Sequence, residues 1–148
     1  MIRILESEKD RSLGFKLRTE VFVNEQNVPK ELELDEKDNS EYTIHIGYFK
    51  DDKLIGVARL IDMDKDIIHI GRVAIDKNHR GEGIGYKLIL GCEDIAKNVL
   101  NKDFTIELGA QLYAENFYKK LGYNRVTNNI YIDAGIEHID MRKTITKL

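Results

Sequence analysis

The stretch RGEGIG, from Arg80 to Gly85, has the clearest chemical character in the sequence because three glycines alternate with larger residues. An apolar pattern with helical spacing follows it directly. The first N–H groups of a helix lack partners within the helix, and the helix dipole adds partial positive charge there. Glycines ahead of such a helix let several N–H groups converge on one anion. The stretch therefore indicates either a phosphate-binding loop or a tight turn that binds nothing.

The spelling of this loop excludes two common phosphate-binding motifs. A Rossmann fingerprint requires G-x-G-x-x-G, and Tyr86 stands where the third glycine would follow Gly81 and Gly83. A P-loop requires G-x-x-x-x-G-K-[ST], and the sequence contains no such run. The loop alone therefore leaves its ligand open.

Other reactive or charged residues allow a functional and a structural interpretation. The acidic run 31–41 can attract a cationic substrate or form a solvated loop, and the second is favoured. His45 lies inside a strand-like run, which favours a structural role, whereas His138 follows a turn and suits a pocket edge. Cys92 falls on the apolar side of a predicted helix, which favours a small buried side chain over a nucleophile. Three arginines can bind a substrate carboxylate or phosphate, or pair with the acidic run: Arg18, Arg59 and Arg72.

The composition is that of an ordinary globular protein: the chain has 148 residues, 42% of them apolar, and a net charge of -3. This length suits one core, so we expect a single domain over residues 1–148. The slight negative charge argues against a nucleic-acid partner, and the N-terminus MIRILESEKD does not have the pattern of a signal peptide. No apolar run approaches the roughly 20 residues that span a bilayer, so we expect no membrane partner and a cytoplasmic location.

The first half of the chain predicts a strand, a helix and three further strands. Residues 2–5 are strand-like, and Ser7 and Asp10 have the spacing of a capping box. The helix that follows should end before Pro29, and the polar segment 30–42 should be mostly loop with one helical turn at most. The expected apolar stripe of this helix consists of Leu13, Leu17 and Val21. Short aspartate-rich joints then separate three strand-like runs, which predict an antiparallel meander: 42–50, 54–63 and 67–75.

The second half predicts two helices and three strands. Residues 105–110 are strand-like, and a short helix from Ala114 to Leu121 should end at Gly122. The last two strand-like runs, 125–132 and 138–144, flank the turn signal DAG. The helix after the glycine loop has an apolar face made of Ile84, Leu88, Cys92, Ile95, Ala96 and Val99.

The glycine loop and a second motif resemble the GNAT N-acetyltransferase superfamily. Arg80–Gly85 matches its Q/R-x-x-G-x-G/A signature, which in that superfamily follows the fourth strand and opens the third helix. The second motif resembles the family pattern N-x-x-A-x-x-x-Y-x-x-x-G-F through Gln111, Ala114, Tyr118, Gly122 and Tyr123. Within it, Gln111 replaces an asparagine and Tyr123 replaces a phenylalanine.

Longer stretches are similar to one bacterial GNAT subgroup, the ElaA-like proteins. They are LRTEVFVNEQNVP, IGRVAI, LGAQ, NFYKKLGY and DAGIEHIDM, and the similarity extends from about Ile2 to Arg142. The resemblance implies the GNAT fold, an α+β (α/β three-layer) architecture. Its central sheet would be mixed and mostly antiparallel, with about seven strands flanked by about four helices.

The resemblance also implies direct acetyl transfer from acetyl-CoA (coenzyme A) to an amine, with no metal. The pantetheine arm would lie along Val73, Ala74 and Ile75, and the N–H of Val73 would polarise the thioester carbonyl, an effect of ~3 kcal/mol. The pyrophosphate would bind the loop through Arg80, Gly81, Glu82, Gly83, Ile84, Gly85 and Tyr86. The second motif adds Gln111, Asn116 and Phe117 to the implied cofactor-binding residues.

Tyr118 occupies the family's position for the acid that protonates the leaving thiolate. A tyrosine pKa of ~10 and a thiol pKa of ~8.5 are close enough for this transfer. Its helical spacing alone would favour a core tyrosine. The attacking amine must be neutral, and the candidates for its base or for a substrate contact are Glu25, Asp35, Asp38, His45 and His138. Arg72, next to the implied reaction centre, is a further candidate for a substrate contact.

Three functional hypotheses stay open at this point. The leading one is an N-acetyltransferase that acts on a small primary amine, such as an amino acid or amino sugar, with a peptide or protein amine as the variant. The second is a CoA-binding regulatory module without catalysis, and Tyr118 and the intact loop argue against it. The third is a nucleotide binder that does not use CoA, and the failed Rossmann and P-loop spellings argue against it. Many relatives in the family are dimers, so the resemblance allows a homodimer, on which the sequence itself is silent.

Overall fold

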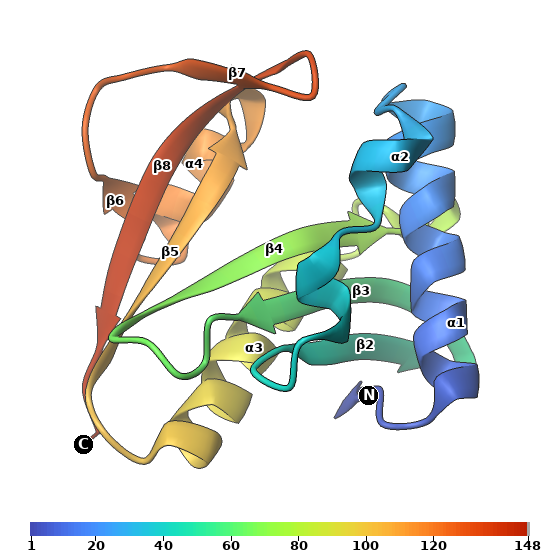
Figure 1. The fold of residues 1–148 in the computed structure, drawn as a ribbon, viewed down its shortest axis with the longest axis horizontal. Coiled ribbons are helices and arrows are strands. Elements are labelled where there is room, and N and C mark those ends of the chain that lie inside the picture. Colours follow the sequence, from blue (N-terminus) through green and yellow to red (C-terminus); the bar gives the residue numbers. More distant parts are fainter. Residues whose placement is uncertain (148) are drawn as a thin grey trace.

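The computed structural model describes residues 1–147 and contains one eight-stranded sheet (Figure 1). The strand order is β1-β2-β3-β4-β5-β8-β6, and β7 pairs with β8 beside this path. All neighbouring strands are antiparallel except β4 and β5, which are parallel. The strands are β1 (Ile2–Ile4), β2 (Ile44–Lys50), β3 (Lys53–Ile61), β4 (Ile67–Ile75), β5 (Phe104–Gln111), β6 (Asn124–Arg125), β7 (Tyr131–Asp133) and β8 (Ile136–Ile145).

Helices cover both faces of this sheet, which gives the three layers that the sequence predicts (Figure 1). The helices are α1 (Glu8–Arg18), α2 (Lys30–Glu33), α3 (Ile84–Leu100) and α4 (Glu115–Lys120). A π-helical segment, η1 (Thr19–Glu25), continues α1 directly. Short 3-10 turns are η2 (Glu36–Asn39), η3 (Lys77–His79) and η4 (Leu112–Ala114).

Two apolar clusters hold the layers together. Under α1, Leu17 and Val21 pack with Val57 and Ala74 of the sheet. On the other face, the apolar side of α3 joins β2–β5 and β8 in a larger cluster. The fully buried α3 residues in that cluster are Leu88, Ile89, Cys92 and Ala96. Since burial of apolar area is the main favourable term in folding, these clusters fix the two helices against the strands between them.

The predicted meander is confirmed as β2, β3 and β4. Lys50 opposes Lys53 across a two-residue turn. Both turn residues, Asp51 and Asp52, have positive φ values of 51° and 63°. Aspartate tolerates this conformation better than most residues, which explains the aspartate-rich joint.

The parallel pair β4–β5 is the most irregular part of the sheet. Its register covers only Ile67–His69 of β4 against Thr105–Glu107 of β5, and beyond that point the strands separate (Figure 1). β4 also contains a bulge against β3, because Val57 pairs with Ala74 while Arg59 pairs with Gly71. Arg72 lies in the bulge with a φ of 50°. Such a conformation is costly for a non-glycine residue and is often found near functional sites.

Some sequence predictions about the elements are wrong in detail. Leu13 and Val99 were assigned to apolar helix faces, but they are 40% and 53% exposed, because each lies on the solvent side of its helix. The run 125–132 is not one strand, since only its ends pair with β8, as β6 and β7. Ser7 caps α1 by accepting from the N–H of Asp10, but the Asp10 carboxylate binds Arg3 instead of closing the capping box.

Within residues 1–147, no helix combines the length and apolar composition that crossing a bilayer requires.

Candidate active site

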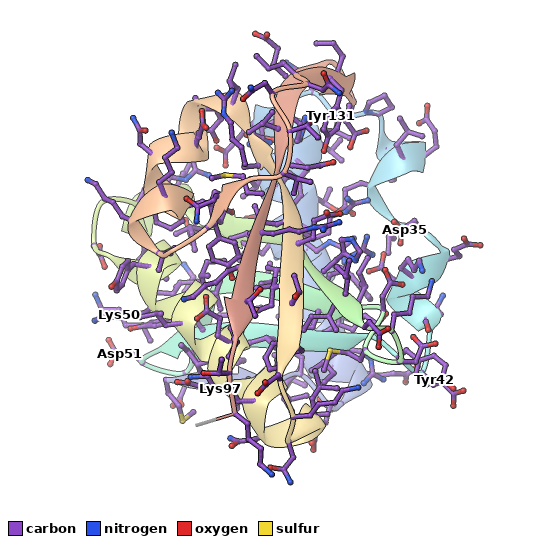
Figure 2. All side chains as sticks on the ribbon, turned by 90° about the vertical axis from the view of Figure 1, so that its left-hand side faces the viewer. Asp35, Tyr42, Lys50, Asp51, Lys97 and Tyr131 are labelled. Carbon is purple, nitrogen blue, oxygen red and sulfur yellow. The ribbon has the colours of Figure 1, made fainter. Side chains whose placement is uncertain are left out.

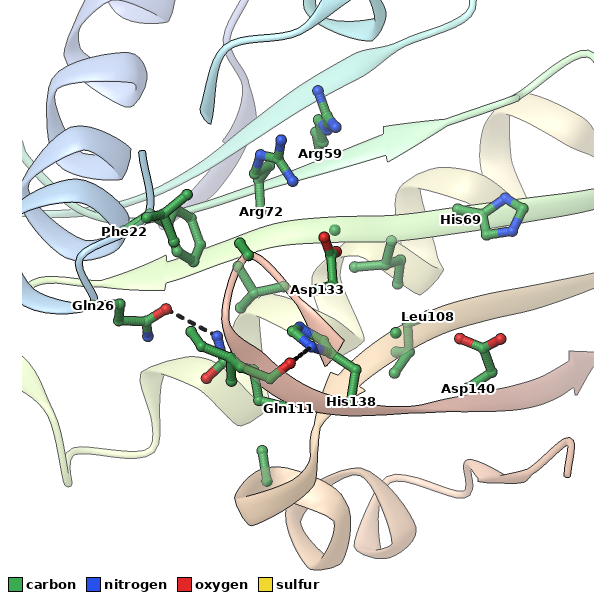
Figure 3. A pocket seen from close by; sticks show the side chains of 18 of the residues that line it. Phe22, Gln26, Arg59, His69, Arg72, Leu108, Gln111, Asp133, His138 and Asp140 are labelled. Atoms are coloured by element: carbon green, nitrogen blue, oxygen red, sulfur yellow. Dashed lines mark hydrogen bonds between the residues drawn. The ribbon is translucent and has the colours of Figure 1, made fainter. Parts of the chain in front are cut away.

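A cavity of about 600 Å³ opens where β4 and β5 separate (Figure 3). Its wall includes several residues that the sequence assigned to catalysis or binding, which are Asp35, Arg72, Val73, Gln111, Tyr118 and His138. Figure 3 shows Arg59 and Arg72 on one side of this space and Gln111 and His138 on the other. These residues come from four separate parts of the chain, and the fold brings them to one place.

Tyr118 reaches the cavity from α4. Its ring packs edge-on against Phe117 and Tyr123, with centroid distances of 5.0 Å and 6.0 Å. Burial raises the pKa of Tyr118 above its ordinary value, so the phenol is protonated at neutral pH and is a weaker acid than the ordinary tyrosine pKa implies. Its hydroxyl takes part in none of the hydrogen bonds found among residues 1–147. The proton is therefore available to a group inside the cavity.

Beyond His69, the cavity-facing edge of β4 pairs with no strand of residues 1–147, although the carbonyl of Ile75 accepts from the Arg80 side chain. The N–H of Asp76 donates to the carbonyl of Ile55 on β3 at 2.8 Å. Because backbone groups alternate sides along a strand, Ala74 also faces β3, while Val73 and Ile75 face the opposite edge. No strand pairs with that edge beyond His69 among residues 1–147. An extended ligand can therefore add to β4 at this point, and Val73 lies beside the cavity.

The glycine loop has the geometry of an anion site. Gly81 and Gly83 have φ values of 81° and 77°, and a side chain built at either would meet nothing within 4 Å. Gly83 caps α3 without a side-chain hydrogen bond, and the first N–H bonded within the helix is that of Lys87. The N–H groups of Ile84, Gly85 and Tyr86 are therefore unpaired in the helix. No acidic residue lies in this first turn to compete for an anion.

The loop connects to the cavity through α4. A Cβ added at Gly85 would lie 3.4 Å from the ring of Phe117, so the loop and α4 approach closely there. Phe117 in turn packs against Tyr118. The loop itself lies outside the cavity wall, and we call the line of contacts from Gly85 through Phe117 to Tyr118 the track. Such a track suits a long ligand with an anionic part at one end.

Arg80 and Glu25 bind each other rather than contributing to the cavity. Their closest nitrogen and oxygen atoms are 2.7 Å apart, and Arg80 also donates to the carbonyl of Ile75. Glu25 does not line the cavity, so its assignment as a base or substrate contact is not supported. The pair ties the glycine loop to the end of β4 and to η1.

The three candidate arginines pair with the acidic run, and we call the resulting six residues the arginine network: Arg18, Arg59, Arg72, Glu33, Asp35 and Asp38. Arg18 is 1% exposed and binds Glu33 at 2.6 Å and Asp38 at 2.7 Å. Arg59 binds Asp35 at 2.7 Å and Asp38 at 2.8 Å. Arg72 donates to the backbone carbonyl of Glu33 and to the Asp35 carboxylate. The prediction of a solvated loop is therefore wrong for Glu33 and Asp38, which are buried.

The arginine network lowers the pKa of two of its carboxylates, Asp35 and Asp38. Burial alone would raise the pKa of Asp38, but hydrogen bonds and charge from Arg18 outweigh burial and lower this pKa to about 2. A hydrogen bond from Arg59 lowers the pKa of Asp35. Both groups are anionic at neutral pH and weak proton acceptors. Asp35 lines the cavity while Asp38 does not, so neither is a suitable base.

His45 and Cys92 are structural residues. His45 is 7% exposed, its Nε2 lies 3.0 Å from the carbonyl of Asp38, and its ring packs edge-on against Phe15. Burial lowers its pKa, and it does not line the cavity, so its assignment as a substrate-side residue is not supported. Cys92 is fully buried, and burial raises its pKa, so the thiolate that a nucleophile requires is disfavoured.

His138 is the candidate base that the structure brings into the cavity wall. Its Nδ1 lies 2.7 Å from the carbonyl of Ile136, which requires Nδ1 to carry a proton and leaves Nε2 as the acceptor (Figure 3). The ring stacks on Tyr131 at a centroid distance of 5.7 Å. A neutral imidazole held in one tautomer can accept a proton from an amine.

The cavity also contains residues that the sequence analysis did not identify. Gln26, after η1, accepts a hydrogen bond from the Gln111 amide at 2.9 Å (Figure 3). His69 lies 3.0 Å from Asp62 and 3.1 Å from Glu107. The others include Phe22, Tyr113, Tyr131, Asp133 and Asp140. In the run YIDAGIEHID, every second residue of each strand lines the cavity, and this alternation was a signal in the sequence that could have identified them.

No cluster of three or more His, Cys, Asp or Glu side chains within residues 1–147 is arranged to hold a metal ion.

Comparison with known proteins agrees with this geometry. Residues 5–145 match the sequence profile of the family described as Acetyltransferase (GNAT) domain. The chain therefore belongs to the GNAT acetyltransferases, a family of acyltransferases that use acyl-CoA and an amine acceptor.

Individual relatives cover nearly the whole chain. It is 36% identical over 140 residues to the uncharacterized N-acetyltransferase YjcF of Bacillus subtilis, covering 95% of this chain and 96% of that protein. The crystal structure of Escherichia coli ElaA matches with a TM-score of 0.86 at 31% identity, covering 97% and 98% of the two chains. An acyl-CoA N-acyltransferase from Pseudomonas aeruginosa matches with a TM-score of 0.85 at 29% identity, covering 97% of each chain. These matches confirm the resemblance to the ElaA-like group and the GNAT fold.

Proposed function

We propose that this acyltransferase moves an acetyl group from acetyl-CoA directly to the primary amine of a small molecule. One observation carries the proposal: Tyr118 and the unpaired edge of β4 at Val73 meet in one cavity, at the end of a track that begins at the glycine loop. This arrangement supplies an acid and a carbonyl-polarising amide at the cavity, and an anion site at the other end of the track.

The chain fits coenzyme A along this track. The free N–H groups at the start of α3 suit a pyrophosphate, and the open space over Gly81 and Gly83 lets it approach the backbone. Arg80 contributes mainly by holding the loop, since Glu25 already compensates its charge. The side chain of Ile84 is buried, so only its backbone can take part. The N–H groups of Val73 and Ile75 on the edge of β4 suit the amide carbonyls of the pantetheine arm, while the Ile75 carbonyl stays with Arg80.

The chemical step needs two proton transfers. The amine nitrogen forms a bond to the thioester carbonyl carbon while the N–H of Val73 stabilises the negative charge on its oxygen. The carbon–sulfur bond then breaks, and Tyr118 gives its proton to the sulfur. His138 takes the proton that the amine loses, through Nε2 or through a water molecule, and returns it to the tyrosinate by way of solvent. No covalent intermediate with the protein is required, which agrees with the burial of Cys92.

The size of the cavity supports a small acceptor. About 600 Å³ is within the range of small-molecule sites, and the β7–β8 hairpin, α2 and η1 surround it. A peptide or protein amine, the alternative acceptor, would need an open groove. A CoA-binding module without catalysis is the other alternative, and the available proton of Tyr118 argues against it. A cytoplasmic location stays a prediction of the sequence, and a homodimer is allowed by the resemblance alone.

The test is a calorimetric titration with coenzyme A alongside a thiol-release assay with acetyl-CoA and a panel of amines. We expect coenzyme A to bind and an amine to be required for rapid thiol release. Gly83→Ala should weaken coenzyme A binding about tenfold, because a side chain at positive φ strains the loop and shifts its N–H groups. Gly135→Ala is the matched control, since Gly135 has a φ of 80° with nothing within 4 Å of its added Cβ. Equal coenzyme A affinity in both variants would contradict the assignment of the loop.

A further inference from the structure

One face of the β7–β8 hairpin forms a wall of the cavity. Tyr131 pairs with His138 and Asp133 pairs with Ile136, so these residues lie on the same face, and Asp140 follows two positions after His138. All five line the cavity. We call Tyr131, Asp133, His138 and Asp140 the acidic hairpin. Figure 2 shows Tyr131 on this hairpin and Asp35 on the segment after α2, whose side chains line the same cavity.

The acidic hairpin carries negative charge that no protein cation compensates. Among residues 1–147, no lysine, arginine or histidine nitrogen lies within 4.0 Å of the Asp133 or Asp140 carboxylate. Asp140 accepts a hydrogen bond from the Tyr131 hydroxyl at 2.6 Å, and this neutral donor leaves the charge in place. The other carboxylates of the wall have partners, since Glu33 and Asp35 belong to the arginine network and Glu107 binds Arg142 at 2.7 Å. The wall therefore has an excess of two negative charges.

The spacing and the aromatic rings of this wall suit ammonium groups. Asp133 opposes Ile136, and Asp140 is four residues further along β8, so the two carboxylates are about 14 Å apart along the strand at ~3.4 Å per residue. The stacked rings of Tyr131 and His138 lie between them. Aromatic faces attract organic cations, and the exposed ring of Tyr113 adds another at the cavity.

We infer that the acceptor is a linear polyamine, with two or more ammonium groups and no carboxylate. The inference rests on the proposed function: the reacting nitrogen lies near Val73 and Tyr118 while a second ammonium binds Asp133 or Asp140. Carboxylates pair well with ammonium groups, and the excess charge of the wall draws such a ligand in. A free amino acid fits poorly, because both arginines of the wall, Arg59 and Arg72, already bind carboxylates of the chain.

The test uses binding as well as turnover, so that the two proposals can fail separately. Calorimetry on the full chain saturated with coenzyme A compares a linear triamine, a monoamine of the same length and a free amino acid. We expect the triamine to bind at least about tenfold more tightly than the other two, with an affinity that falls as salt rises. Equal affinities, or tighter binding of the amino acid, would overturn the inference even if acetyl transfer to some amine is observed.

Variants of the hairpin test whether its two carboxylates bind the triamine. Asp133→Asn with Asp140→Asn should weaken triamine binding at least about tenfold and leave the affinity for coenzyme A unchanged. Glu137→Gln is the control, because Glu137 is an exposed residue on the opposite face of the same hairpin and its substitution removes one carboxylate charge against two in the double variant. An equal loss in the control and the double variant would show a general charge effect and overturn the assignment. Tight triamine binding without any thiol release would instead contradict the proposed catalysis.

Discussion

Both walls of the cavity contain carboxylates, and the two walls differ in whether those carboxylates are paired with a cation. In the arginine network, three guanidinium groups bind three carboxylates, and Arg18, Glu33 and Asp38 are almost completely buried. In the acidic hairpin, two carboxylates reach the cavity without a cation. A charge that is paired within the protein supports the fold, and a charge that is left unpaired at a cavity is available to a ligand. The network thereby positions α2, η2 and the Arg72 bulge, and the hairpin carries the charge that we propose binds the acceptor.

The largest expected effect comes from breaking the arginine network. Arg18→Ala leaves Glu33 and Asp38 buried without their main partner, and such a loss costs about 3–5 kcal/mol of unfolding free energy. Urea unfolding measures the change. Lys119→Ala is the control, because it removes an exposed i,i+4 pair with Glu115 and should cost no more than about 1 kcal/mol. If both variants unfold alike, the network does not stabilise the fold as we describe.

The free energy of unfolding should fall at acid pH, because protonation of Asp38 weakens the arginine network. Arg18 holds the folded-state pKa of Asp38 at about 2, below its ordinary value of 3.8, so its contribution is present above about pH 4. It is lost as pH falls toward 2, at a cost of roughly 2 kcal/mol. Burial also lowers the pKa of His45, so a separate loss begins as pH falls below about 6.5. Urea unfolding between pH 7 and pH 2 should show both steps in the wild type and only the lower one in His45→Gln.

The smallest expected effect on protein stability comes from removing the charges of the acidic hairpin. Asp133→Asn with Asp140→Asn removes no ion pair of the described residues, and asparagine still accepts the hydrogen bond from Tyr131. The unfolding free energy should therefore stay within about 0.5 kcal/mol of the wild type. A loss above 2 kcal/mol would mean that these carboxylates support the fold, and the contrast between the two walls would disappear.

The sequence predicted what depends on local spacing. Periodicity and turn residues predicted the meander, the helix after the glycine loop and the end of the short helix before Gly122. The structure confirms all three. The family motifs brought Val73, Gln111 and Tyr118 to attention, and all three line one cavity. The alternation of Tyr131, Asp133, His138 and Asp140 also depends on local spacing, and it was readable in the sequence.

Pairings between distant residues could not be predicted in the same way. Whether residues 31–41 are solvated depends on Arg18, Arg59 and Arg72, which reach them from α1, β3 and β4. Glu25 and Arg80 are 55 positions apart, and only the fold shows that they bind each other instead of a substrate. His69 entered the site because the parallel register of β4 and β5 places it opposite Glu107. Composition and spacing carry no information about such contacts.

The central claim is that Tyr118 acts as the acid of an acetyl transfer, and Tyr118→Phe tests it most directly. The change removes one hydroxyl that no residue of the described chain holds, so the fold and the glycine loop should be unaffected. We predict that thiol release from acetyl-CoA with a reactive amine falls about 100-fold or more, while the dissociation constant for coenzyme A stays the same. Turnover at the wild-type level in Tyr118→Phe would contradict the account.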